Sequence, residues 1–273
     1  MGAADVIPGV SGGTMAFILG IYEELIAAIR SFDLVFIQHL FRLELKNALN
    51  TVAWRFLFAL GLGILAAIFT LAKFLAWLLT AHPIIIWSFF FGLILASIIT
   101  VNKHIPRWTP PLVLYAILSA AGTFILVGLV PMETPNAPWF LFLAGSIAIC
   151  AMILPGISGA FILVLLGKYF YVLEAVNQRD FLTLAIVAAG ALTGLILFSR
   201  FLGWLFRNHH HPTVACLCGL MLGSLRKVWP WKVQGTNVFP SAWSHEVGLA
   251  ILLGLLGVGL VLSLDWWAAK ESE

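Results

Sequence analysis

The chain has 273 residues, of which 62% are hydrophobic and only 10% are charged, and its formal net charge is +3. Because a soluble domain carries about 25% charged residues, this composition excludes a water-soluble globule and predicts a protein that lies largely in lipid. The small positive charge, without a basic tail or a basic-aromatic stripe, gives no indication of nucleic-acid binding.

The first element is an apolar segment over residues 6–29 that a Pro-Gly pair interrupts. Pro8 lacks an N–H and disfavours helical geometry in the residue before it, and Gly9 lets the backbone turn. We therefore expect a broken helix that forms a re-entrant hairpin over residues 1–30. An upstream helical stretch is expected to supply its first arm.

A polar insert, residues 31–54, leads into three expected spans, and together they complete a first repeat over residues 1–138. Each span approaches the length that a helix rising about 1.5 Å per residue needs to cross a bilayer. Lysines and arginines are enriched in cytoplasmic loops, which places the insert and the loop 102–109 on that side. The expected spans are residues 55–79, 84–101 and 112–130.

The second repeat, residues 139–273, begins with another interrupted segment. Pro155 and Gly156 break the apolar run 139–176, which is expected to be the second re-entrant hairpin. Three further spans follow. Arg226, Lys227 and Lys232 fall on the outer side in this arrangement, against the usual charge rule. The expected spans are residues 181–206, 213–225 and 246–267.

Three pairs of segments match in the same order along the two halves, which predicts an internal duplication. With three crossings in each half, the second repeat is inverted relative to the first. The expected fold is therefore an all-α polytopic membrane protein of two inverted repeats, each a re-entrant helical hairpin plus three transmembrane helices. The matched segments are 4–12 with 151–159, 73–77 with 200–204, and 92–97 with 219–224.

The two interrupted helices are the strongest candidates for a binding site. A new half-helix is expected to begin near Ser11 and near Ser158, with free N–H groups and hydroxyls at its start. Donors buried in a membrane need a partner, and a phosphate would fit. The alternative is that the turns are hinges whose donors bind water or neighbouring helices. The candidate phosphate-binding residues at the turns are Ser11, Gly12, Gly13, Thr14, Ser158 and Gly159, and the turns themselves are Pro8, Gly9, Pro155 and Gly156.

Two basic residues occupy equivalent places inside spans of the two repeats. Lys73 and Arg200 could each extend to the membrane surface, but their equivalence favours an interior cavity in which they contact the phosphate. Asp5, beside the first turn, either caps the helix or carries a coupling proton. Glu23, at the end of the first hairpin, is a second candidate for coupling or gating.

Neither a metal site nor a catalytic site is expected. The cysteines have no spacing typical of zinc ligands, and a solvated loop is favoured over a metal or pH role for residues 209–211. A membrane phosphatase would need a nucleophile with a base in reach, which the sequence does not offer. We therefore expect no enzyme activity and no cofactor. The cysteines, interpreted as packing residues, are Cys150, Cys216 and Cys218.

Two motifs resemble a bacterial and archaeal membrane family formerly of unknown function, the PopT-type polyprenyl-phosphate translocases. The first motif is residues 2–16, followed by Gly20 and Tyr22, and the second is residues 154–159. The resemblance covers nearly the whole chain. It implies a multi-pass protein of the cytoplasmic membrane that returns undecaprenyl phosphate, the lipid carrier of cell-wall synthesis, from the outer to the inner leaflet.

Without the resemblance, the residues predict only an anion-binding site near the membrane midplane. A small-anion transporter or channel with that site therefore stays open as the alternative. The expected partners are the polyprenyl-phosphate substrate and membrane lipids, with coupling to a proton or another cation, and an oligomer is compatible with these observations.

Overall fold

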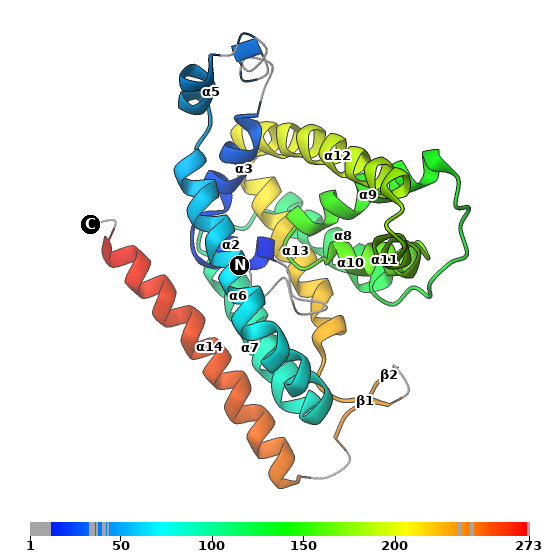
Figure 1. Cartoon of the computed structure of the whole chain (residues 1–273). Helices are drawn as coiled ribbons and strands as arrows, with labels where there is room; N and C mark the ends of the chain where they lie inside the picture. Colours follow the sequence, from blue (N-terminus) through cyan, green and yellow to red (C-terminus); the bar gives the residue numbers. More distant parts are fainter. Residues whose placement is uncertain are drawn as a thin grey trace.

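The computed structural model of the chain describes residues 12–32, 36, 38–39, 42, 44–233, 236–240 and 243–271. The described part is mainly α-helical (Figure 1). Its one small sheet pairs β1 (Lys232–Val233) with β2 (Thr236–Asn237) in antiparallel fashion. The expectation of an all-α membrane protein is confirmed.

The helices follow the order expected from the sequence. In the first half they are α2 (Gly12–Ile18), α3 (Tyr22–Arg30), α5 (Leu45–Thr51), α6 (Trp54–Ala81), α7 (Pro83–Asn102) and α8 (Pro110–Leu126). In the second half they are α9 (Pro138–Ile153), α10 (Gly159–Leu165), α11 (Tyr169–Gln178), α12 (Phe181–Asn208), α13 (His210–Val228) and α14 (His245–Glu271).

Four helices of the described part, α6, α7, α12 and α14, are long and apolar enough to cross a membrane. Helix α8, an expected span, is also apolar but has only 17 residues. Helix α13 has 19 residues, although its length and composition do not mark it as a span. It is packed among other helices, with Val214, Leu217 and Met221 all at most 2% exposed.

Equivalent segments of the two halves have the same local structure. Helices α6 and α12 both have 28 residues, and each is followed by a C-cap histidine with nearly identical backbone angles, φ −138° and ψ 58° at His82 and φ −139° and ψ 50° at His209. The ring of Trp77 lies 5.6 Å from that of His82, and the ring of Trp204 lies 5.4 Å from that of His209. The matched segments 73–77 and 200–204 therefore fold alike, as a duplication would require.

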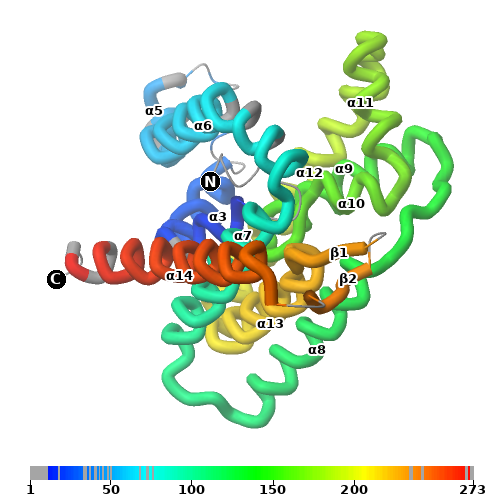
Figure 2. Tube along the Cα trace, turned by 90° about the horizontal axis from the view of Figure 1, so that it is seen from below, coloured from blue at the N-terminus to red at the C-terminus, as the bar shows by residue number. Residues whose placement is uncertain are grey.

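Two of the three most extensive helix contacts in the described part join one half to the other, and the third joins α9 to α12 within the second half. Helix α8 packs along α13, and α14 packs along α7, with α7 and α13 also in contact (Figures 1 and 2). Glycines allow this close approach: a Cβ on Gly92 would lie 1.9 Å from the carbonyl oxygen of Gly254, and one on Gly219 would lie 2.2 Å from that of Ala116. The matched segments 92–97 and 219–224 thus serve helix packing.

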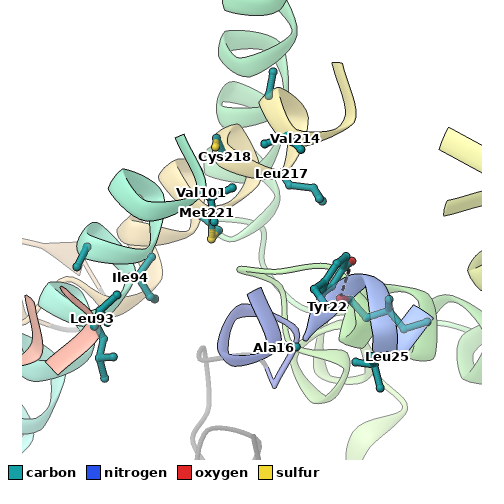
Figure 3. Packing of buried hydrophobic residues seen from close by; sticks show 14 of the residues in the cluster. Ala16, Tyr22, Leu25, Leu93, Ile94, Val101, Val214, Leu217, Cys218 and Met221 are labelled. Atoms are coloured by element: carbon teal, nitrogen blue, oxygen red, sulfur yellow. Dashed lines mark hydrogen bonds between the residues drawn. The ribbon is translucent and has the colours of Figure 1, made fainter. Parts of the chain in front are cut away.

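The buried core lies where α7, α13 and the first hairpin come together. Leu93 and Ile94 of α7 are buried in the same cluster as Met221 of α13 and Ala16 of α2 (Figure 3). By contrast, many of the described large apolar side chains of α6 point outward, and Phe69 is 81% exposed. An apolar helix surface of this kind suits contact with lipid.

Candidate functional site

The second interrupted helix folds back on itself as a hairpin. Helix α9 ends at Ile153, and Gly156 takes φ +89°, a conformation that favours glycine. Helix α10 then returns along α9, since a Cβ on Gly159 would lie 2.6 Å from the carbonyl oxygen of Ala148. Pro155 and Gly156 are both buried at the tip.

The two ends of this hairpin are tied together at its base. The N–H of Met132 donates to the carbonyl oxygen of Leu165 at 2.9 Å. The ammonium group of Lys168, only 1% exposed, donates to the carbonyl oxygen of Thr134 at 2.7 Å and to Oδ1 of Asn136 at 2.5 Å. The segment that enters α9 therefore lies against the segment that leaves α10, as a hairpin entering and leaving on one side requires.

The first hairpin is described from Gly12 onward. Helix α2 has the same length as α10, and Gly20 (φ +68°) follows it as Gly167 (φ +64°) follows α10. Gly12 and Gly13 are buried, and the Thr14 side chain is 1% exposed. The predicted site residues Asp5, Pro8, Gly9 and Ser11 lie outside the described residues.

The two hairpins meet through a pair of hydrogen bonds. The backbone N–H of Gly156 donates to the hydroxyl oxygen of Thr14 at 3.0 Å, and the Tyr22 hydroxyl donates to the carbonyl oxygen of Ile153 at 3.2 Å. Tyr22 lies beside Ala16 and Leu25 in the buried cluster (Figure 3). We call Thr14, Tyr22, Ile153 and Gly156 the turn junction.

Hydroxyl groups, each with a proton that it can donate, lie at the turn junction and beside it. The Thr14 hydroxyl accepts from Gly156 and still carries its own proton to donate. Ser158 is the N-cap residue of α10, but its hydroxyl makes no capping hydrogen bond. Because α10 has only seven residues, its dipole is small, so the individual N–H and hydroxyl groups are the relevant donors.

An apolar pocket of about 490 Å³ begins beside the turn junction. Leu154, next to Pro155, forms one wall, and side chains of α8, α12 and α13 form the others, including Tyr115, Phe201 and Leu217. Phe201 is 52% exposed, so the pocket reaches the outer surface of the helices. An apolar chain could lie here while a polar head group stays at the turn junction.

Of the two predicted cations, Arg200 alone has a described side chain. Arg200 is exposed on α12, and among the described residues it makes no hydrogen bond or ion pair with the turn junction. It is instead close enough to Arg30 for their charges to repel, as is Arg207. Lys73 belongs to α6, but its side chain lies outside the described part of the chain.

Glu23 connects the first hairpin to the start of α13. Its Oε1 lies 3.2 Å from Nε2 of His210, and the Glu23 side chain is 63% exposed. The neighbouring Tyr22 ring contacts Phe206 at 5.8 Å, and Phe206 contacts the ring of His210 at the same distance. Within the described residues, no group of three or more metal-binding side chains gathers here or elsewhere.

Arg30 is the residue that sequence reasoning missed. It lies at the end of the first hairpin, next to the polar insert, and gives no signal of its own in the sequence. A partial signal exists on α12, because Arg200, Gly203 and Arg207 are spaced to share one helix face.

Comparisons with known proteins agree with the sequence motifs. The family described as undecaprenyl phosphate translocase-like matches residues 1–244. A polyprenyl-phosphate transporter of Vibrio cholerae is 41% identical over 295 residues, covering 99% of this chain and 94% of that protein. A polyprenyl-phosphate transporter of Staphylococcus aureus is 32% identical over 248 residues, covering 84% of this chain and 83% of that protein. No solved structure matches the chain significantly.

Proposed function

The chain belongs to the undecaprenyl phosphate translocase-like family, and we propose from this premise that it carries undecaprenyl phosphate across the cytoplasmic membrane. The proposed direction is from the outer to the inner leaflet, which returns the lipid carrier for cell-wall polymer synthesis. The names of both relatives, polyprenyl-phosphate transporters, support the substrate class.

The turn junction is the proposed place where the phosphate head group crosses. The observation that carries this proposal is the buried hydrogen bond from Gly156 to Thr14, because it joins the turn between α9 and α10 in the second half to α2 in the first half. The phosphate is bound in turn by residues of the first hairpin and then of the second. These residues are Ser11, Gly12, Gly13 and Thr14 in the first and Ser158 and Gly159 in the second. Pro8, Gly9, Pro155 and Gly156 form the turns that hold these donors.

The energetics of this crossing are those of a charge leaving water. A bare phosphate is far too costly to bury in hydrocarbon, whereas each charge-assisted hydrogen bond contributes about 1.5–3 kcal/mol. A few such bonds at the turn junction offset part of the cost. The prenyl tail needs no donors and stays in lipid or in the apolar pocket beside Leu154.

Inverted repeats would let the site face each side of the membrane in turn. In this scheme Lys73 and Arg200 attract the phosphate from equivalent positions of the two halves. Asp5 and Glu23 are the proposed coupling or gating groups, and the contact of Glu23 with His210 places it where the first hairpin meets α13.

Transport of a small anion is the alternative that the same donors allow. The apolar pocket beside Leu154 favours a lipid substrate instead, because a free anion would gain nothing from an apolar wall. Binding of farnesyl phosphate, farnesol and inorganic phosphate by the purified protein separates these functions. We expect farnesyl phosphate to bind best, and inorganic phosphate binding as tightly as farnesyl phosphate would favour the alternative.

The same binding assay locates the site. A Gly12→Leu variant places a bulky side chain at the start of α2, where Gly12 is buried, and should block the approach of the phosphate to the backbone. Equal affinity for farnesyl phosphate and farnesol would remove the anion site. Unchanged phosphate binding by a folded Gly12→Leu protein would move the site elsewhere.

A further inference from the structure

Three arginines come together at the end of α12. Arg200, Gly203 and Arg207 are spaced by three and four residues, so they lie along one face of the helix. Arg30, at the end of α3, crosses this face between the two arginines: a Cβ on Gly203 would lie 2.5 Å from its Nη1 and 2.7 Å from its Cδ. Glycine at position 203 thus makes room for the Arg30 side chain. Figure 1 shows α3 beside this end of α12.

This arrangement has no counter-charge in the described part of the chain. None of the ion pairs there involves Arg30, Arg200 or Arg207. The Nε of Arg30 is buried and has no hydrogen-bond partner among the described residues. Arg200 and Arg207 both repel Arg30 electrostatically. Three adjacent cations with an unused buried donor are the arrangement that a bound anion would stabilise.

We propose that Arg30, Arg200 and Arg207 form a binding site for a phosphate monoester, where the lipid head group rests after it leaves the turn junction. This inference rests on the proposed function and extends it. Guanidinium groups bind phosphate in a bidentate manner. A monoester carries a charge of about −1.5 to −2 at neutral pH, more than the single charge of an ordinary phospholipid diester. The site therefore selects the carrier phosphate over bulk lipid.

Helix α3 connects the two sites. Tyr22 at its start belongs to the turn junction, and Arg30 at its end belongs to the arginine site. At about 1.5 Å per residue, these positions are about 12 Å apart along the helix. Arg30 adjoins the polar insert 31–54, which the charge pattern assigns to the cytoplasm. The arginine site is therefore the phosphate-binding site on the cytoplasmic side of the turn junction.

The test compares ligand binding by the purified full chain and three variants. Arg30→Gln removes one cation. Gly203→Ala keeps every charge but displaces the Arg30 side chain. Arg107→Gln, an exposed arginine of another loop, is the matched control. By isothermal titration we expect farnesyl phosphate to bind about tenfold more weakly to Arg30→Gln, several-fold more weakly to Gly203→Ala, and unchanged to Arg107→Gln.

Each other outcome has a distinct meaning. If the native chain binds farnesol as tightly as farnesyl phosphate, the proposed function itself fails. If it prefers the phosphate and Arg30→Gln and Gly203→Ala bind like the native chain, only the arginine site is overturned. Displacement of farnesyl phosphate by an equal concentration of phosphatidylglycerol also overturns it, in favour of a general anionic-lipid surface. If inorganic phosphate binds as tightly as farnesyl phosphate and the same variants weaken it, the phosphate site stands and its ligand is free phosphate.

Discussion

The backbone N–H of Gly156 donates a buried hydrogen bond to the hydroxyl oxygen of Thr14, 142 positions earlier in the chain. One partner belongs to the tip of the second hairpin and the other to the half-helix of the first. If one hairpin moves, either this hydrogen bond breaks or the other hairpin moves with it. Substitutions at this bond therefore test whether the two halves move together.

Replacement of Thr14 by Val should disrupt this contact at nearly constant volume. The variant leaves the Gly156 N–H buried without an acceptor, which costs about 1–3 kcal/mol. We expect a lower melting temperature in detergent and at least tenfold slower transport of a prenyl phosphate. Thr14→Ser keeps the hydroxyl and should retain most of both properties. Equal behaviour of Val and Ser at this position would show that the hydroxyl is not needed.

Tyr22→Phe should weaken the turn junction without opening a cavity. It removes the hydrogen bond from the Tyr22 hydroxyl to Ile153, which is worth about 1 kcal/mol. The matched control is Tyr169→Phe at the equivalent position of the second half, where the ring is 37% exposed. We expect a lower melting temperature for Tyr22→Phe and an unchanged one for Tyr169→Phe. A loss of the same size at position 169 would mean that the effect is not specific to the junction.

Charge removal at Lys73 or Arg200 should abolish transport while folded protein remains in the membrane. The reason is their equivalence in the two halves, which predicts one attracting cation for each side of the path. Transport assays of Lys73→Ala and Arg200→Ala, with Arg107→Ala as the control, measure this directly. Normal rates for both variants would contradict it.

Gly159 has a packing role that separates it from Gly12. A Cβ here would lie 2.6 Å from the carbonyl oxygen of Ala148, so Gly159→Ala should push α10 away from α9 and lower the melting temperature by several degrees. Gly122→Ala on α8 is the control, since no atom of the described residues lies within 4 Å of its added Cβ. That change should be neutral or slightly stabilising. An unchanged melting temperature for Gly159→Ala would refute the packing role.

Local features of the fold could be predicted from the sequence because they depend on neighbouring residues. Pro155 and Gly156 break the helix where expected, and the expected spans correspond to helices. The contacts between halves could not be predicted, since apolar helices of similar composition give no sign of which will pair. For that reason the packing of Gly92 on Gly254 emerges only in the structure.

The candidate site could likewise be predicted from the sequence only where it depends on neighbouring residues. The donors at Thr14 and Ser158 could be recognised from the turn motifs. The turn motif predicts Gly159 as a phosphate-binding residue but does not predict its close contact with Ala148. Arg30 was missed because its position over Gly203 depends on how α3 crosses α12, which no local pattern encodes.

Leaflet transport in liposomes tests the central claim most directly. A farnesyl phosphate with a fluorescent group at the end of its tail is added to the outer leaflet of vesicles that contain the purified protein, and dithionite then destroys the label that remains outside. We predict that the fraction of labelled phosphate protected from dithionite grows with time in vesicles that contain the protein. The matching alcohol should be protected no faster than in empty vesicles. Thr14→Val should slow the protection of the phosphate. Protection of the phosphate at the same rate in vesicles with and without the protein would contradict the account.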